Sequence, residues 1–479
     1  MDTGDGGQMR RTKIVATIGP ASSEPDALKA LLHAGVDVVR LNAAHATPDV
    51  HVQHAATARA AAAALGGSVG LRVDLPGPKL RTGPVAHDEV ELRMGGLVVL
   101  TADDIVGDEH RVSTTIPDLA RWVRVGDEVF LADGAIVLCV EKVDGDDVEC
   151  RVLREGVLRS RKGMHVPRAE GHVEPFTEAD AIALEMAVQI KADFVGLSFV
   201  RHPEDVEAVR ARLPKRGPRP HLVAKIETAV ALDHLAGIVA MADAVMVARG
   251  DLGIQVPARR VPLIQKEIIR FCNMSGKPVI TATQMLESMT RSPLPTRAEV
   301  NDVANAVLDG TDALMLSEET AVGAYPTDTV RTMAEVAEAA EAWPSTRVTP
   351  AGAAAATDDD RVAWAVAHAA VQAAEDLGVA AIVCPTQSGT TARRVAAFRP
   401  SVPIIGSSDE PDALGRLSLV WGVRPLAVRP GQSGRSQLDD ALRAARDAGI
   451  VHAGELVAVV SASQGKRAGS TDTVRVVRA

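Results

Sequence analysis

Short apolar runs that end in polar, chemically reactive residues recur along this chain. Eight of them are near-continuous stretches of Val, Ile, Leu and Ala, at residues 14–19, 36–42, 69–75, 194–200, 221–227, 244–253, 278–286 and 313–320. Such runs are typical of parallel strands that are covered on both faces. Helical stretches lie between most of them, for example at residues 24–35 and 261–276. Strand and helix in eightfold alternation predict an α/β protein built on a (β/α)8 TIM barrel.

The last four runs place reactive side chains at the C-terminal ends of their strands, where TIM barrels carry their active sites. Lys225 and Glu227 are two residues apart and therefore share one face of a strand, and Asp251 lies near the end of the next run. A cation and carboxylates able to bind a metal ion are thus expected at one mouth. The alternative is a surface ion pair and a turn residue, which the fourfold recurrence of the pattern disfavours.

Two departures from the barrel rhythm indicate further domains. The interval from Leu75 to Phe194 is too long for one helix, and its short alternating strands predict a small inserted β domain able to close over substrate. A linker rich in Ala, Pro and Thr precedes a final alternation that predicts an open α/β sheet. The expected divisions are a flexible N-terminus (residues 1–9), the barrel or domain A (10–83 and 172–343), the β-barrel lid or domain B (84–171), the linker (344–360) and domain C (361–479).

Composition narrows the functional classes. The 479 residues carry a net charge of −10, which argues against nucleic acid or an anionic membrane as a partner. The four cysteines form no metal-binding pattern and are expected to be reduced core thiols. The first residues contain no apolar stretch typical of a signal peptide, and no run approaches the ~20 apolar residues of a membrane helix. We expect a cytoplasmic protein.

A series of motifs, in order along nearly the whole chain, resembles the pyruvate kinase family. They are TKIVATIGPAS, RLNAAH, DLPGPKLRTG, SRKG, LSFVR, AKIE, MVARGDLG, GKPVITATQML, PTRAEVNDVANAVLDGTDALMLSEETAVGAYP and TQSGTTARRVAAFRP. The resemblance implies the same three domains and the transfer of a phosphoryl group from phosphoenolpyruvate to ADP, which gives ATP and pyruvate in the last step of glycolysis. It also implies a homotetramer.

The resemblance assigns roles that suit phosphoryl transfer, a reaction that depends on positioning and charge neutralisation. Glu227 and Asp251 would hold Mg²⁺ or Mn²⁺, since hard cations prefer carboxylate oxygens. Lys225 would stabilise the transition state and the developing enolate. Arg40 would bind the phosphoryl group through its planar fork, and its alternative role is a salt bridge.

Other positions match the family's binding residues for the substrate carboxylate and the nucleotide. Free backbone N–H groups at Gly250 and Asp251, with the Thr283 hydroxyl, would receive the substrate carboxylate. Thr283 and Ser317 are the candidates for a hydroxyl and water relay that protonates the enolate, although Thr283 could simply cap its strand. The implied nucleotide-binding residues are Asn42, His45, Arg81 and Lys162.

The chain departs from the family where potassium binds. Members that need a monovalent cation usually read Asn-Phe-Ser-His and Asp-Thr-Lys-Gly-Pro-Glu, whereas residues 42–45 here read Asn-Ala-Ala-His and residues 74–79 read Asp-Leu-Pro-Gly-Pro-Lys. A hydroxyl ligand is missing at Ala44. The Lys79 ammonium can supply, near Asn42 and Asp74, the charge that potassium would contribute. We therefore expect K⁺ not to be required, unless Lys79 merely pairs with a neighbouring carboxylate.

Domain C contains a candidate site for a phosphorylated effector. The turn QSGTTA offers Ser388, Thr390 and Thr391 to an anion, and helix capping alone is the alternative. Further on, the carboxylate of Asp472 disfavours an anionic effector at the segment that contains it.

Two other functions stay open. One is a barrel enzyme that acts on phosphoenolpyruvate or a 2-oxo acid without ADP, against which Arg81, Lys162 and the lid argue. The other is a regulatory paralogue without catalysis, which the intact set at the barrel mouth makes a poorer explanation.

Overall fold

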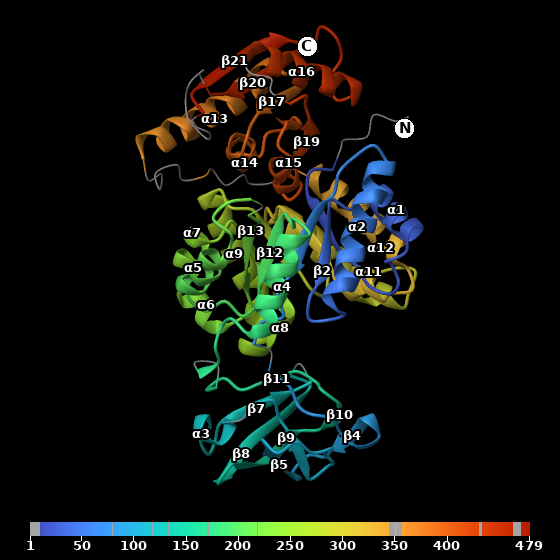
Figure 1. Ribbon diagram of the computed structural model, residues 1–479, viewed down its shortest axis with the longest axis vertical. Coiled ribbons are helices and arrows are strands. Elements are labelled where there is room, and N and C mark those ends of the chain that lie inside the picture. The colour runs from blue at the N-terminus through green and yellow to red at the C-terminus, as the bar shows by residue number, and fades with distance from the viewer. Residues whose placement is uncertain are drawn as a thin grey trace.

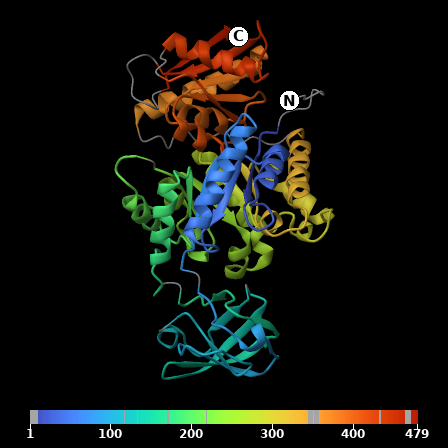
Figure 2. The ribbon, with the colours of Figure 1, turned by 45° about the vertical axis from the view of Figure 1, so that its right-hand side comes forward.

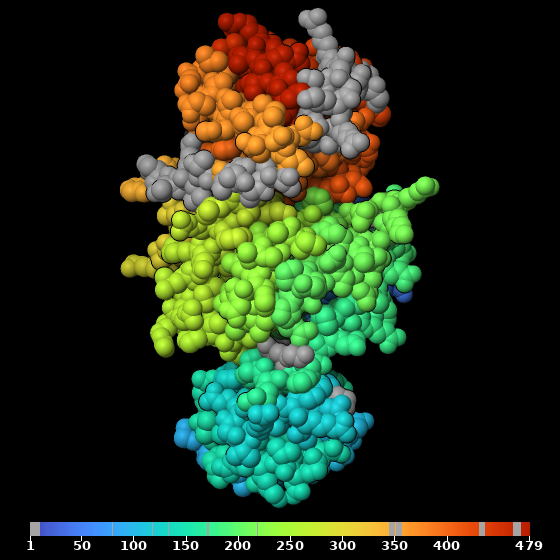
Figure 3. Space-filling view, turned by 90° about the vertical axis from the view of Figure 1, so that its left-hand side faces the viewer, coloured from blue at the N-terminus to red at the C-terminus, as the bar shows by residue number. Residues whose placement is uncertain are grey.

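The computed structural model describes residues 10–78, 80–116, 118–132, 134–169, 172–217, 219–343, 350, 357–430, 434–462 and 471–479. These residues form three masses arranged along one long axis (Figures 1 and 3). The barrel is in the middle, the insertion lies at one end, and the C-terminal α/β unit lies at the other.

The central mass is a closed parallel barrel in which neighbouring strands follow the order β1-β16-β15-β14-β13-β12-β3-β2. Every strand coincides with one of the eight apolar runs, and only β1 begins outside its run, one residue earlier at Lys13, so the TIM-barrel prediction is confirmed. The strands are β1 (Lys13–Thr17), β2 (Val38–Asn42), β3 (Gly70–Asp74), β12 (Phe194–Leu197), β13 (His221–Ile226), β14 (Ala244–Ala248), β15 (Val279–Ala282) and β16 (Ala313–Leu316).

Helices surround the barrel and cover its outer face (Figure 2). Aliphatic side chains between strands and helices form the largest hydrophobic cluster, and a second cluster, which includes Phe194, Met246 and Met315, fills the barrel interior. The helices are α1 (Pro25–Ala34), α2 (Pro48–Ala64), α4 (Glu178–Gln189), α5 (Pro203–Arg212), α6 (Ala229–Asp233), α7 (Leu235–Met241), α8 (Arg249–Gln255), α9 (Val261–Ser275), α10 (Arg297–Leu308), α11 (Glu318–Ala321) and α12 (Pro326–Glu341).

The insertion between β3 and β12 is rich in strands, as the alternating pattern predicts. Six strands form one sheet and two form another, and their aliphatic faces share one core. Isolated bridges between Arg81 and Gly163 and between Thr82 and Thr114 join segments at its base. Its elements are β4 (Glu89–Leu92), β5 (Leu97–Thr101), β6 (Arg111–Ser113), α3 (Leu119–Trp122), β7 (Glu128–Leu131), β8 (Ile136–Asp144), β9 (Asp147–Arg154), β10 (Gly156–Arg159) and β11 (Met164–His165).

The C-terminal unit is an open sheet of order β19-β18-β17-β20-β21 with helices packed against it. The sheet is parallel except for β21, which pairs antiparallel with β20 and was not foreseen. The elements are α13 (Asp358–Leu377), β17 (Ala381–Pro385), α14 (Thr390–Ala397), β18 (Ile404–Ser408), α15 (Pro411–Leu417), β19 (Val423–Ala427), α16 (Gly434–Asp447), β20 (Leu456–Ser461) and β21 (Thr473–Arg478). Most of the expected linker, residues 344–349 and 351–356, lies outside the described residues, as does the expected flexible N-terminus.

Two expectations about single features can be compared with the described residues. All four cysteines are free thiols, and Cys150, Cys272 and Cys384 are buried in hydrophobic surroundings, as expected of core thiols. No described helix combines the length and the apolar character that crossing a membrane requires.

Candidate active site

Lys225 and Glu227 form a buried ion pair at the C-terminal end of β13. Lys225 Nζ lies 2.8 Å from Glu227 Oε1 and donates to Ser198 Oγ at 2.8 Å. Glu227 Oε2 accepts the Phe199 N–H at 2.6 Å. The residues are 8% and 1% exposed, respectively. Because both are buried and bonded to the residues that follow the neighbouring strand β12, the alternative of a surface pair is wrong.

Glu227 and Asp251 are near enough for their charges to interact. Burial raises the pKa of Glu227, and the Asp251 carboxylate adds to this, while Lys225 opposes the shift. Asp251 lies in the first turn of α8, directly after β14. A divalent cation between the two carboxylates would relieve their repulsion, so this donor set fits Mg²⁺ or Mn²⁺.

The metal would need ligands beyond these two side chains. Among the described residues no three His, Cys, Asp or Glu side chains gather into a metal-binding group. Water and substrate oxygens would therefore complete the coordination shell, as is usual for Mg²⁺.

The Arg40 guanidinium lies in the barrel mouth and donates to two side chains. Its Nε donates to Asp74 Oδ2 at 2.7 Å, and its Nη1 donates to Thr17 Oγ1 at 3.0 Å. The salt bridge considered as an alternative role is thus present. It leaves Arg40 oriented by a carboxylate that is itself 1% exposed.

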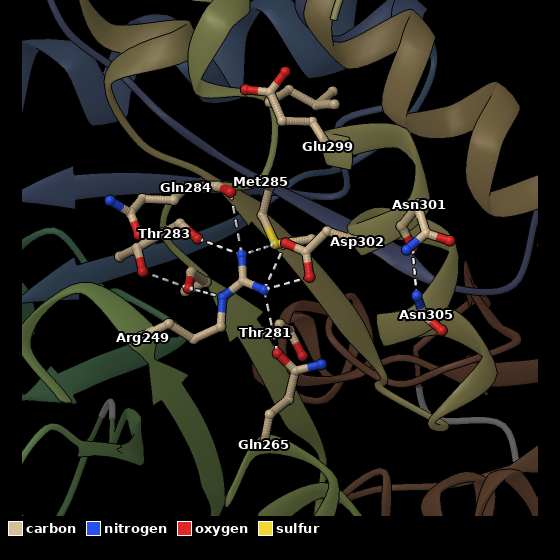
Figure 4. Close-up of polar contacts among 12 residues, drawn as sticks. Arg249, Gln265, Thr281, Thr283, Gln284, Met285, Glu299, Asn301, Asp302 and Asn305 are labelled. Atoms are coloured by element: carbon tan, nitrogen blue, oxygen red, sulfur yellow. Dashed lines mark hydrogen bonds and ion pairs between the residues drawn. The ribbon is translucent and has the colours of Figure 1, made fainter. Parts of the chain in front are cut away.

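Arg249 holds the turn that carries Thr283 (Figure 4). Thr283 and Gln284 adopt φ values of 69° and 53°, a left-handed conformation that is unfavourable for residues with a side chain. The Arg249 guanidinium donates to the carbonyl oxygens of Ala282 at 3.2 Å, Thr283 at 2.6 Å and Gln284 at 3.3 Å. It also donates to both carboxylate oxygens of Asp302, at 2.8 and 2.6 Å.

The turn also determines where the Thr283 hydroxyl lies. Thr283 Oγ1 accepts the Gly250 N–H at 2.8 Å and donates to the Ala282 carbonyl at 2.6 Å. The Gly250 N–H, expected to be free, is therefore occupied, because α8 begins against the end of β15. The structure brings Gly250 and Thr283 into direct contact.

Ser317 lies on the next strand end, after β16. Its N–H donates to Glu319 Oε2 at 2.7 Å, and burial raises the pKa of Glu319. Since β15 and β16 are neighbours in the barrel, Ser317 and Thr283 follow adjacent strands.

The four expected nucleotide residues lie on two different segments. Arg81 pairs with Gly163 at the base of the insertion, and the Thr82 N–H donates to the Lys162 carbonyl at 2.9 Å. Asn42 is the last residue of β2 and His45 follows it, and Asn42 Oδ1 accepts the Ala44 N–H at 3.3 Å. The structure thus brings Arg81 and Lys162 onto paired segments.

A cavity of about 650 Å³ separates the insertion from the barrel mouth. Asp251, Thr228 and Phe199 line it from the barrel, and Gly163, next to Lys162, lines it from the insertion. The cavity therefore extends from Asp251 at the barrel mouth to the insertion.

Two family models match this chain: pyruvate kinase, barrel domain, over residues 9–330, and pyruvate kinase, alpha/beta domain, over residues 364–477. The chain belongs to the pyruvate kinase family. The resemblance inferred from the motifs is therefore confirmed, and the protein is a phosphotransferase. Members of the pyruvate kinase family bind phosphoenolpyruvate and ADP, generally use Mg²⁺ and usually use K⁺.

Individual relatives support the family over nearly the full length. A pyruvate kinase of Bacillus licheniformis is 39% identical over 474 residues, and one of Geobacillus stearothermophilus is 41% identical over 473 residues. A Staphylococcus aureus pyruvate kinase is 37% identical. Each alignment covers 98% of this chain and 80% of the relative.

The residues expected to form the monovalent-cation region are only partly described. Asn42 and Asp74 are register partners on β2 and β3, so they lie at the same level of the barrel. Lys79 lies outside the described residues.

The candidate effector turn has a definite hydrogen-bond pattern. Ser388 Oγ and Thr390 Oγ1 are 2.9 Å apart, whereas Thr391 Oγ1 bonds to Thr471 Oγ1 at 2.8 Å in the interior. No side chain caps the N-terminus of α14, where Gly389 occupies the cap position. Capping by these hydroxyls, the alternative role, is therefore not present. Most of the segment that precedes Asp472, residues 463–470, lies outside the described residues.

Two arginines of the site were missed by sequence reasoning. Arg72 lies inside the barrel beside Asp74, and Arg249 supports Thr283. Arg72 could have been found from the sequence, since a charged residue interrupts an otherwise apolar strand run two places before Asp74. Arg249 was harder to find, because an arginine at the end of a strand is also common at solvent-exposed positions.

Proposed function

We propose that this chain is a cytoplasmic enzyme that transfers the phosphoryl group of phosphoenolpyruvate to ADP, giving ATP and pyruvate, with Mg²⁺ or Mn²⁺ and without a need for K⁺. The observation that carries the proposal is the buried Lys225–Glu227 pair beside Asp251 at the barrel mouth. A cation and two carboxylates at one strand edge suit a trianionic substrate bound together with a divalent ion.

Charge neutralisation is the main task of the barrel mouth. Arg40 binds the phosphoryl oxygens, and Lys225 faces the charge that develops as the bond to the enolate oxygen breaks. Bound at Glu227 and Asp251, the divalent ion would act as a Lewis acid on substrate oxygens. Ser198 and Glu227 hold the Lys225 ammonium in place, so little reorganisation is needed during transfer.

The end of the substrate that carries the carboxylate is assigned to the turn after β15. The Thr283 hydroxyl and the Gly250 N–H, which bond to each other at 2.8 Å, would exchange this contact for the substrate carboxylate. After transfer the enolate carbon takes up a proton. A hydroxyl is too weak an acid to release one alone, so Thr283 and Ser317 would pass it from water.

The nucleotide would be held between the barrel and the lid. Arg81 and Lys162 lie on paired segments at the lid base, and Asn42 and His45 approach from the end of β2. Lid closure would bring the two groups together and exclude water from the phosphoryl group. The assembly is proposed to be a homotetramer, with Ser388, Thr390 and Thr391 as candidates for binding the phosphate of an effector.

The proposal is tested by coupling pyruvate formation from phosphoenolpyruvate to NADH oxidation, with and without ADP and with and without K⁺. We expect turnover that needs ADP and Mg²⁺ and that changes less than twofold when KCl is added to buffer free of sodium and potassium. The Lys79→Glu variant should gain activation by K⁺. Pyruvate release without ADP would instead support a different barrel enzyme, absence of turnover a regulatory paralogue, and strong activation of the wild type by KCl would contradict the role of Lys79.

A further inference from the structure

A guanidinium is completely enclosed within the barrel. Arg72 is 0% exposed and lies on β3 two residues before Asp74, so both side chains face the same side of the strand. Its Nη2 lies 3.0 Å from Met246 Sδ on β14, and its Nη1 lies 4.0 Å from Met315 Sδ on β16. Each of these strands is three places from β3 around the barrel, in opposite directions. The Arg72 side chain therefore extends across the barrel interior.

Arg72 is linked to Arg40 through one carboxylate. Arg72 Nε donates to Asp74 Oδ1 at 2.6 Å, and Arg40 Nε donates to Asp74 Oδ2 at 2.7 Å. Arg40 and Arg72 are also register partners on β2 and β3, so two like charges lie side by side. Asp74 separates them and gives one oxygen to each.

Space for this arrangement depends on a glycine. Gly196 on β12 is the register partner of Asp74, and a Cβ at this position would collide with Asp74 Oδ1 and Arg72 Nη2. TIM-barrel interiors are normally filled by branched apolar side chains. Placing an ion there carries a desolvation penalty of several kcal/mol, so packing alone does not explain Arg72.

The charges of the mouth support a functional explanation. Burial alone would raise the pKa of Asp74, but Arg72, Arg40 and Lys225 hold it well below its usual range. Burial lowers the pKa of Arg72, and the carboxylates of Asp74 and Glu227 oppose this. Asp74 is therefore a permanent carboxylate between two cations.

We propose that Arg72 is a positioning residue, which fixes Asp74 so that Arg40 presents its guanidinium to the transferred phosphoryl group. A carboxylate with both oxygens available binds an arginine through two parallel N–H bonds. Because Arg72 occupies Oδ1, Arg40 contacts Asp74 through Nε alone and keeps Nη2, which bonds to no described residue, for substrate. Without Arg72 the Asp74 carboxylate is free to rotate and to engage both sides of Arg40. This inference rests on the proposed role of Arg40 in binding phosphoenolpyruvate.

The test compares Arg72→Met, whose side chain suits the apolar interior, with the wild-type enzyme. We expect the KM for phosphoenolpyruvate to rise about 10- to 100-fold, the range for a lost charge-assisted hydrogen bond, with a smaller change in kcat and a KM for ADP within twofold. Arg72→Lys, which keeps the charge, should recover part of the affinity. Met246→Leu alters the same interior layer without removing a charge and should leave both KM values unchanged.

Equilibrium binding separates this inference from the proposed function. Calorimetric titration of phosphoenolpyruvate with Mg²⁺, in the absence of ADP, should show the same loss of affinity in Arg72→Met. If the wild-type protein binds phosphoenolpyruvate but does not convert it to pyruvate, the proposed function is contradicted. The role of Arg72 in binding is then still tested by the titration. The inference is overturned if folded Arg72→Met binds phosphoenolpyruvate like the wild type, or if Met246→Leu produces an equal loss. Where Arg72→Met does not fold, Arg72→Lys in the same titration decides.

Discussion

At the scale of single residues, Glu227 combines a structural hydrogen bond with the metal-binding role proposed for it. Its Oε2 accepts the Phe199 N–H, which fixes a residue with φ of 54°, while its Oε1 bonds to Lys225. A carboxylate that orders its own surroundings loses little entropy when it takes up a metal ion. Burial and the Asp251 charge nevertheless make its ionised form harder to reach.

This balance predicts how metal affinity depends on pH. A metal ion needs the ionised carboxylate, and the pKa of Glu227 is raised above the ordinary value of 4.5. Affinity for Mn²⁺ should therefore be full at high pH and should decline, as the pH falls, earlier than an exposed glutamate would allow. Titration followed by electron paramagnetic resonance of free Mn²⁺ measures it.

A matched pair of variants identifies the responsible carboxylate. Glu227→Gln should lower Mn²⁺ affinity by roughly 10- to 100-fold, which is typical of losing a metal-site group, and should weaken the pH dependence. Glu319→Gln is the control, because Glu319 is also buried with a raised pKa but bonds to the Ser317 and Leu286 N–H groups. Equal losses in both variants would contradict the assignment of the metal to Glu227.

Part of this site could be predicted from the types and spacing of its residues, and part could not. Lys225 and Glu227 could be placed on one face because strand periodicity fixes their directions. Nothing in the sequence shows that Glu227 also holds the Phe199 N–H, since this contact depends on how two adjacent strands end. Arg72 was hidden for a related reason, because its partners come from β2, β14 and β16 and meet only when the barrel closes.

At the scale of elements, the end of β15 and the start of α8 act as one unit. Arg249, the first residue of α8, donates to three consecutive carbonyl groups from Ala282 to Gln284. Left-handed conformations at non-glycine residues cost of order 1–3 kcal/mol each and persist only where their surroundings enforce them. One guanidinium therefore maintains the position of the Thr283 hydroxyl.

Removal of this support should affect both stability and activity. In Arg249→Met the carbonyl groups lose their donor and Asp302 loses its partner, so we expect the free energy of unfolding to fall by roughly 2–4 kcal/mol. The kcat for pyruvate formation should fall at least about tenfold, since a misplacement near 1 Å has effects of this size. Denaturant unfolding and steady-state kinetics measure the two effects.

The Asp302→Asn variant is the matched control, because it removes the charge of Asp302 but keeps an acceptor for Arg249 Nη1. It should retain most of the activity. If Asp302→Asn lost as much activity as Arg249→Met, the ion pair rather than the carbonyl contacts would position Thr283.

The elements themselves were largely predictable from pattern. Parallel strands covered on both faces produce apolar runs, and all eight barrel strands were found in this way. β21 was not, because residues 473–478 mix Val with Arg and the sequence between them and β20 shows no apolar helical pattern. Such a strand can be recognised only once the neighbouring strand with which it pairs is known.

At the scale of the whole molecule, the barrel and the C-terminal unit meet at the end of the barrel opposite the active site. Asp193, just before β12, accepts the Leu71 N–H through Oδ2 at 2.8 Å. Gly415 of α15 packs so closely on this carboxylate that a Cβ would collide with it. Docking of α15 therefore requires a glycine at this position and leaves Asp193 only partly exposed to water.

This burial gives the folded protein a definite pH dependence. Burial raises the pKa of Asp193 from 3.8 to about 6, although the Leu71 N–H opposes the shift. Between these pH values the folded chain binds the proton more tightly than the unfolded chain, so stability falls as the pH rises through this window. The difference in pKa corresponds to roughly 3 kcal/mol.

Asp193→Asn removes the ionisation but retains an oxygen for the Leu71 N–H. We expect the free energy of unfolding of the variant to equal that of the wild type near pH 4, and to exceed it by up to roughly 3 kcal/mol above pH 6.

Asp37→Asn is the control of opposite sign, because Arg10 and Lys13 overcome burial and lower the pKa of Asp37. That variant should lose stability at neutral pH. Denaturant midpoints at both pH values measure the differences, and an Asp193→Asn variant no more stable than the wild type at pH 7.5 would show that the contact with α15 does not penalise the charge.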